Sequence, residues 1–177
     1  MNTTKRTAFI ASALVALALA AGTALAAEVN CIADNLCFGT NDHDTMHGSA
    51  GKDFMEGNSG GDTLYGLNGA DLLRGDNLTN GTPHGNDKLY GGSGPDSIGG
   101  YGGNDLLIGG RGNDTIYAWE SNLANPGRDT VKAGRGNDTI YDDDDHKDKI
   151  DCGKGVDEVT YDAGLDTIEN CETTHPL

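Results

Sequence analysis

The chain is poor in basic residues. Only 12 of its 177 residues are Lys or Arg, against 28 Asp and Glu, and the formal net charge is −16. Partners rich in phosphate require cationic side chains to neutralise them. The charge balance therefore excludes a nucleic-acid partner and an anionic membrane surface, and it suits metal cations. The length predicts a single domain.

Motifs of catalysis are also missing. The sequence contains no His-Glu-x-x-His zinc motif and no Gly-x-Ser-x-Gly nucleophile motif. Almost all of the chain after residue 38 is occupied by the repeat described below, which leaves no room for a separate catalytic domain. We therefore predict that the protein is not an enzyme.

Long apolar runs are absent except at the N-terminus. Residues 1–26 begin with Lys5 and Arg6, continue with an apolar run and end in Ala24-Leu25-Ala26. This order is typical of a secretory signal peptide. We predict that the segment is removed, that the mature protein is secreted and extracellular, and that it has no membrane contact after cleavage. A retained membrane anchor is the alternative, which the shortness of the apolar core disfavours.

Cysteine is scarce but even in number. The four cysteines are Cys31, Cys37, Cys152 and Cys171. An exported chain meets an oxidising environment, in which cysteines pair. Four cysteines allow three pairings, and their number alone leaves all three open.

Glycine is abundant, and its distribution reveals an internal repeat. The 28 glycines fall mostly into a nonapeptide Gly-Gly-x-Gly-x-Asp-x-U-x with U apolar, as in residues 109–117 (GGRGNDTIY). The aspartates of this frame are Asp44, Asp53, Asp62, Asp71, Asp87, Asp96, Asp105, Asp114, Asp129, Asp138, Asp148, Asp157 and Asp166. Two residues after each aspartate stands Met, Leu, Ile or Val. Tandem copies in this number make the motif highly specific.

The nonapeptide resembles the hemolysin-type, or RTX, calcium-binding repeat, and the resemblance covers residues 39–169. It implies an all-β fold, namely a right-handed parallel β-roll (a β-solenoid) of about thirteen nonapeptide repeats. In that family the glycine-rich loop turns the chain, the x-U-x triplet forms a short strand, and calcium lies between loops stacked on one edge. The resemblance therefore implies multiple Ca²⁺ ions as cofactors and the thirteen aspartates as their ligands.

The residue types of the loop support calcium independently. Glycine adopts a positive φ and allows close backbone approach. Carbonyl and carboxylate oxygens are the ligands of Ca²⁺, which takes about six to eight of them. One loop cannot supply so many, so two stacked loops are expected to share an ion. Because the core is small and the acidic loops repel one another, we expect folding to be coupled to calcium binding.

The frame also divides the chain. We expect a signal peptide at 1–26, an N-terminal cap with a disulfide at 27–38, the roll at 39–169 and a C-terminal cap or tail at 170–177. Alternate repeats lie on opposite edges, so the extra residues 78–84 and 121–126 and the acidic run 142–148 fall on one edge. The other edge is expected to be a regular ladder that ends in Asp53, Asp71, Asp96, Asp114, Asp138 and Asp157. Insertions that lie on one face of a solenoid either form a binding face or are tolerated there without a function.

The predicted roll favours one cysteine pairing. Cys152 and Cys171 are separated by about one full turn, and stacked strands lie about 4.8 Å apart, within disulfide range. Cys31 and Cys37 precede the first repeat, roughly 30 Å away along the roll. We predict the disulfides Cys31–Cys37 and Cys152–Cys171, one at each end.

Two acidic stretches raise further metal-binding alternatives. Residues 42–47 (DHDTMH) contain His43 and His47, but no third and fourth ligand follows at a spacing typical of zinc. Residues 142–146 (DDDDH) are interpreted as a solvated acidic turn, with Asp142, Asp143 and Asp145 as additional calcium ligands in the alternative.

Four tyrosines share the last position of their repeats. Tyr65, Tyr90, Tyr117 and Tyr141 are expected to point outward and to stack along the two sheets. A sugar-binding aromatic patch that includes Trp119 is the alternative. Two further functions therefore accompany calcium binding: a calcium-stiffened adhesin or matrix module that binds a glycan, extracellular polymer or surface, and an ice-binding solenoid, which requires a regular Thr or Asn row.

Overall fold

The computed structural model describes residues 28–31, 36–77, 84–119 and 127–177. The predicted signal peptide and most of both longer insertions lie outside these residues. The described segments contain strands and turns, and no helix among them is long and apolar enough to cross a membrane.

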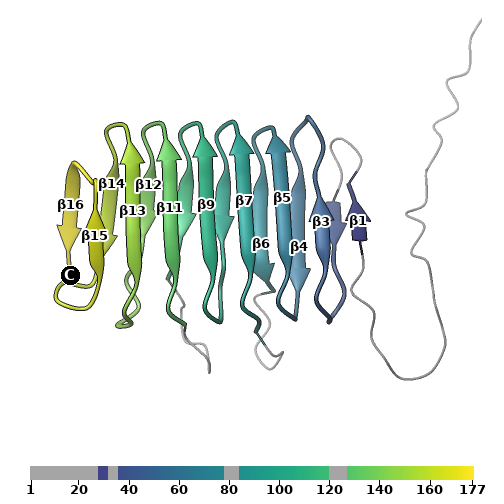
Figure 1. Cartoon of the computed structure of the whole chain (residues 1–177), viewed down its shortest axis with the longest axis horizontal. Coiled ribbons are helices and arrows are strands. Elements are labelled where there is room, and N and C mark those ends of the chain that lie inside the picture. The colour runs from purple at the N-terminus through teal and green to yellow at the C-terminus, as the bar shows by residue number, and fades with distance from the viewer. Residues whose placement is uncertain (1–27, 32–35, 78–83, 120–126) are drawn as a thin grey trace, which may run out of the picture.

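The fold is all-β and consists of two parallel sheets stacked face to face (Figure 1). One sheet contains β1 (Glu28–Asn30), β3 (Thr45–His47), β5 (Thr63–Asn68), β7 (Lys88–Ser93), β9 (Leu106–Arg111), β11 (Thr130–Arg135), β13 (Lys149–Lys154) and β15 (Thr167–Glu169). The other contains β2 (Leu36–Phe38), β4 (Phe54–Asn58), β6 (Leu72–Asp76), β8 (Ser97–Gly99), β10 (Thr115–Tyr117), β12 (Thr139–Tyr141), β14 (Glu158–Tyr161) and β16 (Thr173–Pro176). Successive strands alternate between the sheets, which confirms the predicted parallel β-roll.

The core is a single file of apolar side chains between the sheets. Corresponding residues of successive rungs pair in register, so Ile116 of β10 lies between Ile98 of β8 and Ile140 of β12. The fully buried members are Met46, Met55, Leu64, Leu73, Leu89, Ile98, Leu107, Ile116, Val131, Ile140, Ile150 and Val159. Strand side chains alternate between the two faces, so only the U residue and the residue two places after it point inward.

The sheets continue beyond the repeats at both ends. In the predicted N-terminal cap, β1 pairs with β3 and β2 pairs with β4. In the predicted C-terminal tail, β16 pairs with β14. The structure forms the disulfides Cys31–Cys37 and Cys152–Cys171, with Cα atoms 6.0 and 5.2 Å apart, in the pairing expected from the sequence.

Glycine occurs in the turns at two special places and is required at one of them. We count positions from the first residue of each nonapeptide, so the aspartate is position 6. Position 2 and position 4 both adopt positive φ, as in Gly134 (+117°) and Gly136 (+143°). At position 4 the adjacent rung is also very close, because a Cβ on Gly136 would lie 1.6 Å from the carbonyl oxygen of Gly112. Only glycine fits there.

Candidate metal centres

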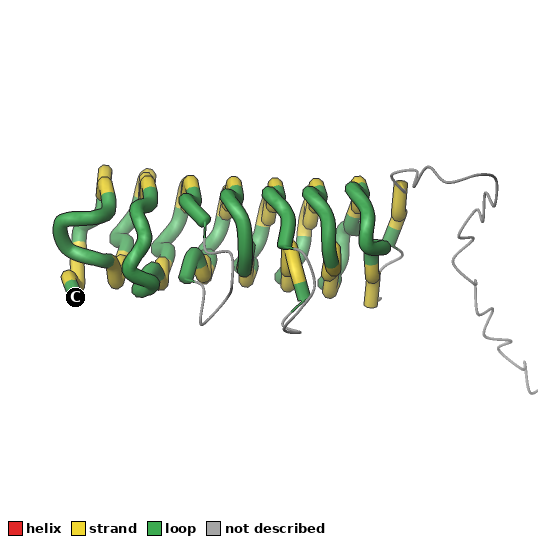
Figure 2. Tube along the Cα trace, turned by 90° about the horizontal axis from the view of Figure 1, so that it is seen from below, coloured by secondary structure: helices red, strands yellow, loops and turns green. Residues whose placement is uncertain are grey.

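The position-6 aspartates form two ladders, one along each edge of the roll. The odd edge contains the turns before the odd-numbered strands and carries Asp44, Asp62, Asp87, Asp105, Asp129, Asp148 and Asp166. The even edge carries Asp53, Asp71, Asp96, Asp114, Asp138 and Asp157. The odd edge is the lower one in Figure 1 and faces the viewer in Figure 2. All of these aspartates except Asp166 are at most 4% exposed.

Hydrogen bonds link each aspartate to the next rung of the same edge. On the even edge the Asp96 N–H donates to Oδ1 of Asp114 (2.9 Å), and the Asp114 N–H donates to Oδ1 of Asp138 (2.8 Å). On the odd edge the Asp105 N–H donates to Oδ1 of Asp129 (2.9 Å). Asp114 therefore neighbours Asp96 and Asp138, as predicted, while Asp105 and Asp129 lie on the opposite edge.

In eight of the ladder aspartates the second carboxylate oxygen has no protein donor. Buried Oδ2 atoms without a hydrogen-bond partner in the described part of the chain belong to Asp62, Asp71, Asp87, Asp96, Asp114, Asp138, Asp148 and Asp157. A Cβ on Gly109, at position 1, would lie 2.4 Å from Oδ2 of Asp114 and 2.5 Å from the carbonyl oxygen of Ala133. A carboxylate oxygen and a carbonyl of the next rung thus converge on the bare side of this glycine. Such oxygen donors fit calcium.

The ladder ends differ from the interior. Oδ2 of Asp44 accepts the Thr40 N–H (2.5 Å), and Oδ2 of Asp53 accepts the Ser49 N–H (2.7 Å). In both cases the donor is at position 2 of the same repeat. Seven of the interior repeats have position 2 in the left-handed region instead, at Asn58, Leu67, Gly92, Tyr101, Gly110, Gly134 and Gly153. The motif alone does not separate these two classes, because only four of the later repeats have glycine at position 2, at 92, 110, 134 and 153.

Burial makes the ladder carboxylates hard to ionise. Desolvation raises the pKa of Asp71 and Asp114 to about 6 and that of Asp96 to about 7, although a backbone N–H opposes the shift in each case. On the odd edge desolvation raises the pKa of Asp87 to about 8. Neighbouring aspartates of the same edge raise these pKa values further. A bound cation would favour the ionised form and relieve this cost.

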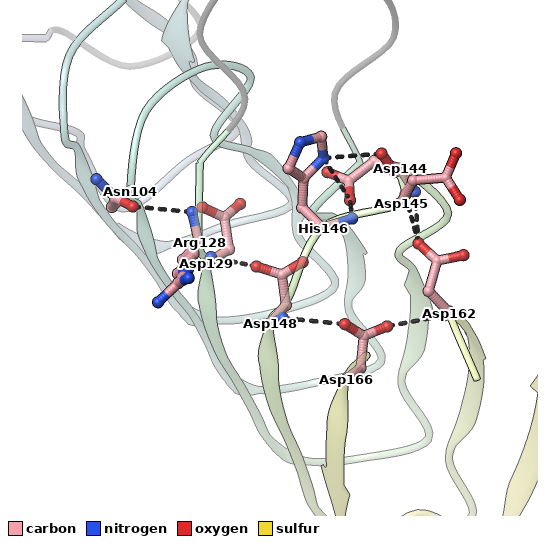
Figure 3. Close-up of polar contacts among 9 residues, drawn as sticks. All are labelled: Asn104, Arg128, Asp129, Asp144, Asp145, His146, Asp148, Asp162 and Asp166. Atoms are coloured by element: carbon pink, nitrogen blue, oxygen red, sulfur yellow. Dashed lines mark hydrogen bonds and ion pairs between the residues drawn. The ribbon is translucent and has the colours of Figure 1, made fainter. Parts of the chain in front are cut away.

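The acidic run 142–148 is not the solvated turn that the sequence suggests. Asp142 is fully buried and the Asp144 side chain is only 3% exposed, whereas Asp143 and Asp145 are exposed. The interpretation was wrong for these two residues because the turn folds back onto Asp162. The N–H groups of Asp144 and Asp145 both donate to Oδ2 of Asp162, at 2.9 and 2.6 Å (Figure 3).

Asp76 is a buried acid that we did not expect from the sequence. This residue takes position 2 of the repeat that contains the 78–84 insertion, and it is fully buried. Its Oδ2 accepts the Gly85 N–H (3.1 Å) and lies 3.2 Å from Nδ1 of His84. Desolvation, followed by the charge of Asp87, raises the pKa of Asp76 to about 8. An aspartate at position 2, directly before an insertion, is the signal that would have found it.

The two N-terminal histidines do not form a metal site. Nδ1 of His43 accepts the Gly61 N–H (2.8 Å), and the His47 ring stacks on Tyr65 with centroids 5.0 Å apart. Within the described ranges, the group of three or more metal-ligating side chains that come together is Asp142, Asp148 and Asp166.

The outward tyrosines stack in two rows, as predicted. Tyr65 and Tyr90 have ring centroids 4.9 Å apart on one sheet, and Tyr117 and Tyr141 have centroids 5.4 Å apart on the other. The second pair lines an open groove of about 470 Å³ together with Trp119 and Asp143. Aromatic stacking is therefore common to both sheets, and at the second pair it lines a groove.

A parallel β-roll whose glycine turns end in buried aspartates defines a calcium-binding solenoid. The family model of the RTX calcium-binding nonapeptide repeat matches residues 38–77, 85–122 and 123–146, in four copies. These matches cover more than half of the chain, and the protein belongs to that family. No curated protein matches the chain. The family supports a calcium-binding repeat protein, and the count of about thirteen nonapeptides stays a prediction.

Proposed function

We propose that the protein is a secreted calcium-binding β-roll whose folding is coupled to Ca²⁺ binding. Its chemistry is coordination rather than catalysis. The observation that carries the proposal is the row of buried carboxylate oxygens without hydrogen-bond partners along both edges. Buried charges require a counter-charge or they destabilise the fold. Calcium supplies that charge and accepts oxygen donors from two stacked loops at once.

The proposed ligands are the thirteen aspartates of the two ladders together with the carbonyl oxygens of their turns. An interior carboxylate such as Asp114 accepts the backbone N–H of the preceding rung, here Asp96, with one oxygen. In eight of the ladder aspartates the other oxygen has no hydrogen-bond partner and remains available to a cation. Because a loop has neighbours on both sides, an interior aspartate such as Asp114 contributes to two adjacent sites.

Three features support secretion. The N-terminal segment 1–26 has the composition of a signal peptide. Both disulfides require an oxidising compartment. RTX repeats are also typical of secreted proteins. We propose removal of residues 1–26, with short caps at 27–38 and 170–177 on either side of the calcium-binding roll.

The test combines a calorimetric calcium titration with circular dichroism of the mature chain, residues 27–177. The calcium-depleted chain is expected to lose its β signal and to regain it as calcium is added, in parallel with the heat of binding. A depleted chain that keeps a strong β signal and unfolds cooperatively would refute coupled folding. A titration without heat or ion uptake would refute calcium binding itself.

The groove at Tyr117 and Tyr141 favours a second candidate function, namely calcium-dependent binding of a glycan or extracellular polymer. The stacked rings, Trp119 and the Asp143 carboxylate form one continuous surface. Aromatic faces pack on the apolar faces of sugars, and a carboxylate accepts hydrogen bonds from hydroxyl groups. A glycan array with and without calcium tests it, with Trp119→Ala as the variant and Tyr65→Ala, on the opposite sheet, as the control. Equal binding by both variants would contradict the proposal.

Ice binding has no comparable support. The residues that open the strands of one sheet pair in the order Thr45, Thr63, Lys88, Leu106, Thr130, Lys149 and Thr167. The threonine row is therefore interrupted at two places, by three residues that are not threonine. We do not propose an ice-binding face.

A further inference from the structure

Asp142 stands where most of the roll has glycine. It takes position 1 of its repeat, and the first eight repeats have glycine there, at 39, 48, 57, 66, 75, 91, 100 and 109. Its N–H donates to the carbonyl oxygen of Thr160 (2.9 Å), which fixes its backbone at the end of β12. Position 1 points into the roll, so the side chain is fully buried.

Three carboxylates meet at this place. One oxygen each of Asp142, Asp148 and Asp166 lies within 4.8 Å of the other two. Neither oxygen of Asp142 has a hydrogen-bond partner, and Oδ2 of Asp148, which is 4% exposed, has none either. Figure 3 shows the adjoining chain of carboxylates, in which Asp129, Asp148, Asp166 and Asp162 follow one another. A fully buried and unpartnered side chain thus points at two further carboxylates.

No basic side chain among the described residues balances this cluster. Asp129 and Asp144 add further negative charge around Asp142. The nearby His146 instead contacts Asp144 at 3.3 Å, and Lys147 and Lys149 are exposed. Another buried acid of the odd edge, Asp76, has His84 at 3.2 Å. The compensating charge at Asp142 must therefore come from outside the chain, either as a cation or as a proton shared with Asp148 or Asp166.

We propose that Asp142, Asp148 and Asp166 form a separate calcium site with three carboxylates, outside the nonapeptide scheme. In that scheme position 1 contributes no side-chain ligand, and here it contributes a carboxylate. The family match ends at residue 146, so two of the three ligands lie beyond it. The inference rests on the proposed calcium-binding function. Because affinity for hard cations rises with the number of charged ligands, this site fills before the interior sites.

The experiment is a calorimetric titration of the mature protein with calcium alone. Asp142→Gly restores the glycine of the other repeats, and Asp142→Asn keeps the shape without the charge. Asp143→Asn, an exposed neighbour in the same acidic run, is the matched control. Both Asp142 variants are expected to bind one ion fewer, or to weaken the tightest step by about tenfold or more, and the control is expected to match wild type. Circular dichroism at saturating calcium checks that each variant folds.

The possible failures are distinguishable. If wild type takes up no calcium, the proposed function fails. If wild type binds calcium and Asp142→Asn keeps the same count and tightest step, the compensating charge is a proton and the three-carboxylate site is refuted. If Asp142→Gly binds more calcium than wild type, Asp142 blocks an ordinary repeat site, which also refutes it. A calcium peak among the three carboxylates in a crystal grown with calcium would support the site directly.

Discussion

The two edges of the roll are built from the same motif but differ in charge. On the even edge the acidic neighbours that raise the pKa values of Asp71, Asp96 and Asp114 belong to the same ladder, and these pKa values rise to about 6 or 7. The odd edge contains the additional buried acids Asp76, Asp142 and Asp162. The pKa of Asp76 rises to about 8 and that of Asp142 to about 10. The same repeat motif thus forms two edges that differ in their number of buried acids, and therefore in how much cationic charge they require.

The largest expected effect is the loss of the glycine that lets rungs stack. Gly136→Ala places a Cβ 1.6 Å from the Gly112 carbonyl oxygen on the even edge. Gly164→Ala, on the odd edge, also has positive φ (+89°) but meets nothing within 4 Å. We expect a loss of about 3 kcal/mol or more in the free energy of unfolding for the first and about 1–2 kcal/mol for the second. Urea unfolding in saturating calcium measures the free energy of unfolding of both variants. Equal losses would show that the cost comes only from the positive φ and not from the close approach of the next rung.

The next effect separates the edges as calcium ladders. Asp114→Ala should weaken the two sites on either side of it on the even edge, and Asp105→Ala should do the same on the odd edge. Each variant is expected to lose two ions, or to weaken two by about tenfold, because each interior loop contributes to two sites. Calcium titration of both single variants and the double variant measures this. Losses that do not add in the double variant would contradict the independence of the edges.

The dependence of stability on pH should have opposite signs without and with calcium. The pKa values of buried aspartates in the calcium-free fold lie above the ordinary 3.8, so their stabilising contribution is complete below 3.8. It is lost as the pH rises through about 6 on the even edge and about 8 at Asp87. Calcium binds the ionised carboxylates, so its affinity should fall as the pH falls through the same range. Circular dichroism as a function of pH, in calcium-depleted and in calcium-saturated buffer, tests both predictions. A calcium-depleted chain that is most structured at pH 8 would contradict the predicted loss of stability at high pH.

The smallest effect compares two strained residues with the same φ. Leu67 on the even edge and Tyr101 on the odd edge both sit at position 2 with φ +76°. Leu67 is 46% exposed, so Leu67→Gly relieves strain with little loss of packing and should stabilise the fold by up to about 1 kcal/mol. Tyr101→Gly also removes a ring that lies beside Gly99 and interacts with Arg74, and it should destabilise. Thermal unfolding with calcium measures the difference, and the same sign for both would refute this account.

The features that could be predicted from the sequence are those that follow from the nine-residue period. The frame placed Ile116 in the core, Asp114 between Asp96 and Asp138, and the two disulfides at the ends, because each follows from counting nine residues. It did not predict β1, β2 or β16, because these strands lack the motif and form by pairing with the exposed hydrogen-bonding groups of the last rungs. Burial of Asp142 was missed because four consecutive acids are normally solvated, and only the fold reveals that position 1 points inward.

The hydrogen bonds of both ladders run in one direction, and this gives the roll an order of assembly. The N–H of each position-6 aspartate except Asp166 is satisfied by the rung that follows it in the sequence, as Asp138 is by Asp157 (2.8 Å). The last even-edge donor, Asp157, ends on Glu172 (3.0 Å). A chain delivered N-terminus first therefore has an unsatisfied donor at its growing end until residue 172 arrives. We expect truncation before Glu172 to weaken the C-terminal rungs far more than removal of β1 weakens the N-terminal ones, which amide exchange in calcium would reveal.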